Sequence, residues 1–211
     1  MNPLIELTAG APVASLLLLT FAGISVLGLW KFPELIERNL LRPYWLVRRG
    51  QYATLVTSGF VHADFMHLLF NGFTFYAFAF SLERRIGSTS FAMLYAAGLL
   101  LSSAGTWVQH RREPGYASLG ASGAILAVLF ASIVYFPGAS LFILPIPVPI
   151  PAPLFAVGYL AFTYYAARRG GGRVNHDAHL FGALAGVAFV AVSDPPAIGA
   201  AVQQFVAMIS R

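Results

Sequence analysis

The stretch at residues 118–136 reads SLGASGAILAVLFASIVYF. It carries no charged residue, and its length is close to the roughly 20 apolar residues that a helix needs to cross a bilayer. Ser122 stands near its start, flanked by Gly120 and Gly123. The stretch therefore predicts a membrane-spanning helix with a polar residue in its first turn.

The composition extends this prediction to the whole chain of 211 residues. Hydrophobic residues make up 58% and charged residues 10%, and the mean hydropathy is +0.72, whereas soluble domains carry about 25% charged residues. Polar breaks divide the chain into six apolar runs, at residues 12–30, 58–82, 90–109, 118–136, 141–167 and 176–192. We predict an all-α membrane protein, a six-transmembrane-helix bundle. It forms a single domain over residues 1–211, with a core at about 12–192 and a C-terminal tail at 193–211.

The first and fifth runs have features that bear on their structure. The first ten residues hold no Lys or Arg, so they lack the positive region of a secretory signal, and we expect the first run to be retained as a span. Prolines alternate with apolar residues over 145–153, and we expect this stretch to begin the fifth span in extended form or as a kinked turn. The chain has no cysteine, which excludes a disulfide framework and thiolate chemistry.

The net charge of +5 comes from short basic clusters between the apolar runs. They form no basic-aromatic stripe of the kind that binds nucleic acid, so we expect no nucleic-acid partner. Contact with lipid headgroups explains the clusters more simply, and the bilayer is the expected partner. The sequence makes no prediction of oligomeric state.

Polar residues inside the runs are the candidates for function, because such residues are costly in lipid. They open the second, fourth and sixth runs, which all enter from the same membrane face because successive spans alternate in direction. We therefore expect them to meet at a similar depth. The residues concerned are His62, His67 and Asn71 in the second run, Ser122 in the fourth, and His176, Asp177 and His179 in the sixth.

The spacing of residues along each run supports the expectation that these polar groups meet. His67 and Asn71 are four residues apart and share one helix face. His179, Gly182 and Gly186 form a stripe on the sixth span, and small residues at 123, 127 and 131 form one on the fourth. Small stripes let helices approach closely in membranes, which would bring the Ser122 hydroxyl within reach of the His179 ring.

These residue types suit acyl transfer. A serine hydroxyl becomes a nucleophile when a neighbouring imidazole takes its proton, and the imidazole can return that proton to a leaving amine. The oxyanion that forms needs hydrogen-bond donors. His67, the Asn71 amide and the backbone N–H of Ser122 can supply them, which completes the set of groups for peptide-bond hydrolysis.

Three sequence motifs in this chain resemble those of one family, the rhomboid intramembrane serine proteases. They are H-x-x-x-N at His67 to Asn71, G-x-S-G at Gly120 to Gly123, and A-H-x-x-G at Ala178 to Gly182. His62, the segment LERRIG at 82–87 and the run TWVQ at 106–109 add to the resemblance, which covers about residues 12–192. One position departs: well-known members carry an aromatic four residues after the serine, and this chain carries Leu126.

The resemblance implies a catalytic dyad of Ser122 and His179 in a water-filled cavity, with His67, Asn71 and the Ser122 backbone N–H lining the oxyanion hole. It implies single-span membrane proteins as substrates, cleaved where their helix is locally unstable near its end. It implies no metal and no cofactor. The segment 31–51 would lie partly in the membrane beside the bundle.

The sequence also allows other interpretations of the function. A rhomboid-like protein that binds clients without cutting them is the main alternative, and a metal-dependent protease or a transporter are others, although H-E-x-x-H and inverted repeats are absent. His62 could hold the start of the second span or contact headgroups. We expect Asp177 and His176 to be interfacial rather than catalytic. Glu83, with Arg84 and Arg85, is expected to form a structural loop network.

The charge distribution conflicts with the orientation that the resemblance implies. The positive-inside rule would make the face that carries the three motifs cytoplasmic. We expect the opposite, an active site that opens outside the cytoplasm, in a bacterial plasma membrane. The opposite face carries Arg84, Arg85 and Arg211, and the motif face carries Lys31, Arg38, Arg42, Arg48, Arg49, Arg111, Arg112, Arg168, Arg169 and Arg173.

Overall fold

A computed structural model describes residues 10–143, 146–169 and 174–210. Pro145, Arg173 and Arg211, which entered the predictions above, lie outside the described residues. The elements in chain order are α2 (Pro12–Trp30), α3 (Pro33–Asn39), α4 (Pro43–Arg48), α5 (Thr54–Thr57), the 3₁₀ helix η1 (Ser58–Phe60), α6 (Phe65–Ile86), α7 (Ser88–His110), α8 (Ser122–Tyr135), β1 (Ser140–Ile143), β2 (Ile146–Pro151), α9 (Ala152–Arg169), α10 (His176–Ser193) and α11 (Pro195–Ile209).

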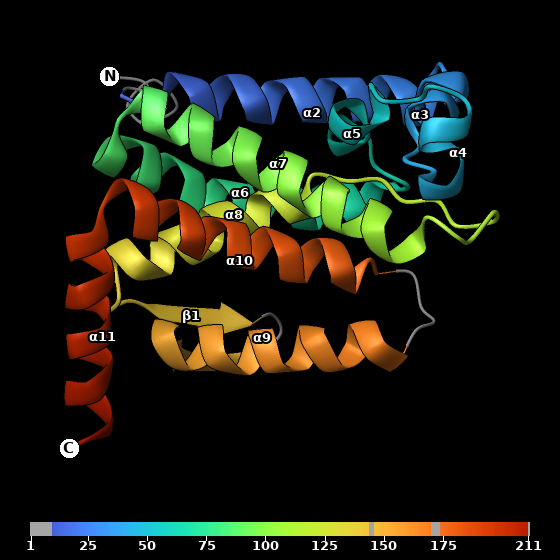
Figure 1. The fold of residues 1–211 in the computed structure, drawn as a ribbon. Helices are drawn as coiled ribbons and strands as arrows, with labels where there is room; N and C mark the ends of the chain where they lie inside the picture. The colour runs from blue at the N-terminus through green and yellow to red at the C-terminus, as the bar shows by residue number, and fades with distance from the viewer. Residues whose placement is uncertain (1–9, 144–145, 170–173, 211) are drawn as a thin grey trace.

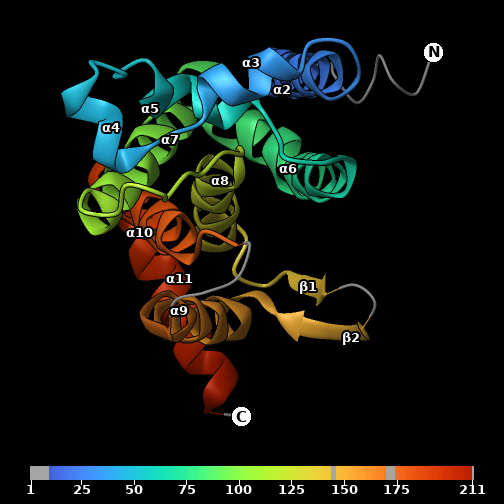
Figure 2. The same cartoon turned by 90° about the vertical axis from the view of Figure 1, so that its right-hand side faces the viewer.

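Long helices packed side by side form the body of the molecule. Figure 1 shows α2, α6, α7, α8, α9 and α10 running along a shared direction, while α11 crosses one end. Seen along that direction, α8 lies between α6, α7 and α10 (Figure 2). Among the described residues, α2, α6, α7 and α10 are long and apolar enough to cross a membrane. The predicted class, an all-α membrane bundle, is confirmed, and six spans stay a prediction.

The central helix α8 is shorter than its neighbours because it starts inside the protein. Its 14 residues extend about 21 Å at 1.5 Å per residue, less than the roughly 30 Å of a hydrocarbon core. Every residue from 123 to 133 is buried. Irregular backbone at membrane depth is tolerated where protein surrounds it or where it lines a cavity, so the segment 111–121 can lead into α8.

The second span starts later than predicted. Residues 58–64 are not part of the long helix, which begins at Phe65. The side chain of Asp64 accepts a hydrogen bond from the backbone N–H of His67 at 2.8 Å, and this cap satisfies one of the free N–H groups of the first turn. The predicted start at residue 58 was wrong because the apolar run includes the short 3₁₀ helix η1 and the non-helical residues 61–64.

The fifth span is also shorter than predicted. The strands β1 and β2 pair antiparallel beside α9, and α9 begins only at Ala152 (Figure 2). Proline cannot donate to a sheet and is tolerated on edge strands, so the alternating prolines suit this two-stranded ribbon. Of the two forms expected for the proline stretch, the extended one is confirmed at residues 146–151, and the span predicted from residue 141 is helical only from Ala152.

Glu83 forms hydrogen bonds with the N-terminal ends of two helices, α2 and α7. Its carboxylate is fully buried and accepts hydrogen bonds from the backbone N–H groups of Val13 at 3.0 Å and Ala14 at 2.6 Å, and from the Ser88 hydroxyl at 2.6 Å. A carboxylate is favourable at a helix N-terminus, where free N–H groups and the helix dipole are positive. The structural role predicted for Glu83 is confirmed.

Candidate active site

Backbone hydrogen bonds to segments far away in the sequence hold the residues just before Ser122 in place. Gly120 has a φ of 116°, a region that glycine adopts at no steric cost, and its N–H donates to Ser58 O at 2.9 Å. Ser118 pairs with Leu41 through two backbone hydrogen bonds of 2.9 and 3.0 Å. The helix α8 then begins at Ser122, so the Ser122 N–H lies in the first turn, where N–H groups have no partner within the helix.

The side chains of Ser122 and His179 meet. Oγ of Ser122 lies 2.9 Å from Nε2 of His179, and the other ring nitrogen, Nδ1, lies 2.9 Å from the phenol oxygen of Tyr159. A neutral imidazole that accepts at Nε2 must carry its proton on Nδ1. The arrangement therefore favours the tautomer in which His179 donates to Tyr159 and accepts the Ser122 hydroxyl proton.

Glycine contacts between α8 and α10 make this meeting possible. A Cβ atom added to Gly182 would lie 2.0 Å from the carbonyl oxygen of Gly123, and one added to Gly186 would lie 2.2 Å from that of Ala127. Neither position can hold a larger side chain unless the helices move apart. The close approach predicted from the small-residue stripes is confirmed.

The second helix of the site, α6, presents His67 and Asn71. A Cβ atom on Gly120 would lie 2.7 Å from Cε1 and 2.8 Å from Nε2 of His67, so the His67 ring packs directly on the backbone that precedes Ser122. Asn71 is buried, and its Nδ2 donates to the carbonyl oxygen of His67 at 2.9 Å. Both side chains line the same cavity as Ser122, and this cavity is described next.

A cavity of about 940 Å³ contains these groups. Its walls come from α6, α8, α9 and α10 and from the segment that leads into α8. Polar groups therefore share a hollow with apolar side chains, as in sites that bind a substrate and orient it. The lining includes His67, Asn71, Ser118, Ser122, Ile125, Leu126, Leu129, Phe155, Tyr159, His176, Asp177 and His179.

His62 lies behind the site instead of at the membrane surface. It is fully buried, with Nδ1 2.8 Å from Ser25 Oγ and Nε2 3.4 Å from the backbone N of Ala121. Burial lowers the pKa of His62 to about 3, so the ring is neutral and Nε2 can accept from Ala121. The headgroup contact considered for His62 was wrong, and the ring supports the residue before Ser122.

The residues around the start of α10 face a different partner. Asp177 Oδ2 lies 2.9 Å from Nε2 of His110, whose Nδ1 lies 3.1 Å from Glu113, so Asp177 is not on the His179 ring. His176 approaches the His179 ring edge-on with centroids 6.1 Å apart. In the part of the chain that the structure describes, no three His, Asp or Glu side chains gather so that they could hold a metal ion.

Comparison with known proteins decides the family. Residues 49–193 match the Rhomboid domain family. This chain belongs to the rhomboid family. The resemblance drawn from the three motifs is thereby confirmed.

Several curated proteins are similar to this rhomboid. "Rhomboid protein 1, mitochondrial" of Saccharomyces cerevisiae is 29% identical over 178 residues, which cover 79% of this chain and 49% of that protein. "Presenilin-associated rhomboid-like protein A, mitochondrial" of Danio rerio is 31% identical over 172 residues, 78% of this chain and 44% of that protein. YdcA of Bacillus subtilis (strain 168), which also carries a rhomboid name, is 38% identical over 82 residues, 39% of this chain and 40% of that protein. The chain thus spans about half the length of these relatives or less.

The aromatic partner of His179 in this rhomboid escaped sequence reasoning. Leu126 belongs to a buried cluster against which Phe155 and Tyr159 of α9 pack, and the Tyr159 ring lies at 25° to the His179 ring with centroids 6.5 Å apart. An aromatic from α9 therefore faces the histidine, although residue 126 is a leucine. The only sequence signal was a tyrosine inside an apolar run, which does not distinguish Tyr159 from Tyr164 or Tyr165.

Proposed function

We propose that this rhomboid is an intramembrane serine endopeptidase that cuts the transmembrane segments of single-span membrane proteins. Ser122 and His179 are the proposed catalytic dyad. The observation that carries the proposal is the 2.9 Å contact between Ser122 Oγ and His179 Nε2 inside the cavity. A hydroxyl and an imidazole at hydrogen-bond distance are the arrangement that activates a serine.

The first step follows from the protonation state of the imidazole. Ser122 Oγ attacks the carbonyl carbon of the scissile bond, and its proton passes to Nε2 of His179. The imidazolium then carries a proton on each nitrogen, and the one on Nδ1 remains donated to Tyr159. Hydrogen bonds to a charged group are stronger than those to a neutral one, so Tyr159 stabilises His179 more in its charged form.

The oxyanion that forms needs donors in place before the reaction. We assign this role to the backbone N–H of Ser122 and the side chains of His67 and Asn71, which line the same cavity. A single donor of this kind is worth about 10²- to 10³-fold in kcat. Asn71 has one amide hydrogen on the His67 carbonyl and a second one to offer.

Completion of the reaction uses the same groups in reverse. His179 gives its proton to the leaving amine, which departs with one half of the substrate, and Ser122 is left as an ester. Water in the cavity then attacks the ester carbonyl while His179 takes a proton from it. His179 returns this proton to Ser122 Oγ as the ester bond breaks, and the half of the substrate that carries the new carboxyl group is released.

The test is cleavage of a single-span substrate in liposomes by the wild-type protein, Ser122→Ala and His179→Ala. Ser132→Ala is the matched control, because Ser132 is a buried serine on the same helix. We expect cleavage by the wild type and the control and none by the other two. If all four proteins bind the substrate and none cuts it, the chain is a client-binding rhomboid instead.

The protein is a membrane protein, and its orientation and compartment belong to the proposal. We propose that the cavity opens away from the cytoplasm of a bacterial plasma membrane, a compartment that fits the Bacillus relative, whereas the yeast and zebrafish relatives are named mitochondrial. A reporter fused after Arg211 tests the orientation. A cytoplasmic reporter supports it, and a reporter on the other side contradicts it.

A further inference from the structure

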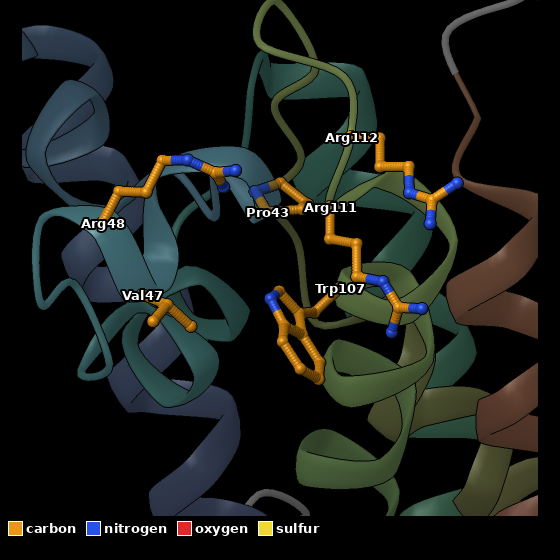
Figure 3. Close-up of a pocket in the computed structure, with 6 residues that line it drawn as sticks. All are labelled: Pro43, Val47, Arg48, Trp107, Arg111 and Arg112. Atoms are coloured by element: carbon orange, nitrogen blue, oxygen red, sulfur yellow. The ribbon is translucent and has the colours of Figure 1, made fainter.

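A second, smaller cavity lies on the motif face, away from Ser122. It measures about 220 Å³ and lies between α4 and the end of α7 (Figure 3). None of its lining residues reaches the cavity around Ser122, so the proposed chemistry gives it no role. It is lined by Pro43, Val47, Arg48, Trp107, Arg111 and Arg112.

The lining combines an apolar part with three arginines. Figure 3 shows Val47 and Arg48 on the α4 side and Trp107, Arg111 and Arg112 on the α7 side. Trp107 is one turn before Arg111 on a helix that runs toward the motif face, so it lies about 6 Å deeper along the bundle. Val47 and Trp107 thus lie on the bilayer side of the cavity and the three arginines on the water side (Figure 3).

The guanidinium groups of Arg48 and Arg111 lie over aromatic rings. Among the described residues, no carboxylate forms an ion pair with Arg48, Arg111 or Arg112. The Arg48 guanidinium lies 3.9 Å from the Tyr44 ring centroid and donates to the Tyr44 carbonyl at 2.8 Å. The Arg111 guanidinium lies 5.7 Å from the Trp107 ring centroid. Stacking leaves most guanidinium N–H groups free for an anion.

This combination selects an amphiphile. Tryptophan and arginine at the end of a spanning helix mark the headgroup level of a bilayer, and guanidinium groups bind phosphate oxygens in bidentate fashion. A free phosphate would satisfy the arginines and leave Val47, 55% exposed, without an apolar partner. An acyl chain beneath the phosphate would cover both Val47 and Trp107.

We propose that the cavity between α4 and α7 binds the phosphodiester of an anionic phospholipid. Arg48 approaches the phosphate from the α4 side, Arg111 and Arg112 line it from the α7 side, and the acyl chains lie against Val47 and Trp107. The lipid joins α4 to the end of α7, next to the hydrogen bond from Trp45 Nε1 of α4 to the carbonyl of Pro114, in the segment that follows α7, at 3.2 Å.

Binding is measured by native mass spectrometry and thermal unfolding of the full chain in a neutral detergent. The probes are phosphatidylglycerol, phosphatidylcholine and inorganic phosphate. We expect saturable retention of phosphatidylglycerol with a raised unfolding midpoint, and no such effect from the other two. Equal effects of both lipids, or an effect of inorganic phosphate alone, would overturn the proposal.

Variants locate the site. Arg48→Gln with Arg111→Gln is expected to weaken phosphatidylglycerol binding by about tenfold or more, because each hydrogen bond to a charged group contributes enough for such a factor. The control is Arg168→Gln with Arg169→Gln, since these arginines also stack on tyrosines, at the end of α9, and line neither cavity. Equal weakening by both pairs would mean diffuse charge attraction and would refute the site.

A second pair guards against a folding defect. Arg48→Lys with Arg111→Lys keeps both charges and loses the bidentate geometry, so we expect intermediate binding with an unfolding midpoint like that of the wild type in lipid-free detergent. Binding as weak as in the glutamine pair supports a need for the planar guanidinium groups. Binding as strong as in the wild type contradicts the bidentate arrangement.

Discussion

The phenol oxygen of Tyr159 lies 2.9 Å from Nδ1 of His179, on the opposite side of the ring from the nitrogen that meets Ser122. The two residues come from neighbouring helices, α9 and α10. Because one imidazole nitrogen is occupied by Tyr159, the other is left to face the serine hydroxyl. The contact therefore makes Tyr159 a positioning residue for the proposed base.

Tyr159→Phe removes this hydrogen bond and keeps the ring. We expect kcat to fall about tenfold or more with little change in KM, because the lost bond is to a group that becomes charged during the reaction. Steady-state cleavage kinetics measure this, with Tyr164→Phe on the same helix as the control. Equal kcat values for wild type and Tyr159→Phe would leave the tyrosine a packing role only.

Gly182→Ala tests the close contact of α8 and α10. Its new methyl group would lie 2.0 Å from the Gly123 carbonyl oxygen, and overpacking of this kind costs about 1–3 kcal/mol. We expect a lower unfolding midpoint and loss of cleavage as Ser122 and His179 separate. Gly158→Ala is the control, because a Cβ there meets nothing within 4 Å; a Gly182→Ala protein as stable and active as this control would count against the contact.

Glu83→Gln tests the buried cap of α2. An amide keeps one acceptor oxygen and turns a donor toward the N–H groups of Val13 or Ala14, so we expect destabilisation of about 1–3 kcal/mol. Thermal unfolding in detergent measures it. The exposed Glu34→Gln is the comparison, and equal unfolding midpoints for the two variants would show that the cap contributes little.

His67→Ala and Asn71→Ala test the proposed oxyanion donors. Each is expected to lower kcat by about 10²- to 10³-fold while the unfolding midpoint stays near that of the wild type. Thr74→Val, one turn further along α6 in the same cavity, serves as the control. A change confined to KM would mean that His67 and Asn71 bind substrate and do not stabilise the oxyanion.

The sequence predicts the helices best where lipid and small residues decide the structure. The helix Pro12–Trp30 matches its prediction at both ends, because an uninterrupted apolar run in a bilayer must satisfy its backbone within a helix. The meeting of Ser122 with His179 was expected from stripes of glycine and alanine. Spacing along one helix is information that a single sequence carries directly.

Contacts between distant segments could not be predicted in this way. The antiparallel pairing of β1 with β2 joins two strands, and apolarity alone does not predict that these strands pair with each other. The Tyr159 contact depends on the rotation of α9, and the burial of His62 depends on Ser25, 37 residues earlier. Each of these partners is set by packing and not by a local pattern.

The most direct test of the central claim is covalent labelling of Ser122 by a fluorophosphonate, which reacts with serines whose proton a neighbouring base removes. Mass spectrometry of the labelled protein identifies the modified residue, and Ser118, in the same cavity, is the internal comparison. We expect a label on Ser122 in the wild type and none in His179→Ala. Equal labelling of Ser122 in both proteins, or a label on Ser118 instead, would contradict it.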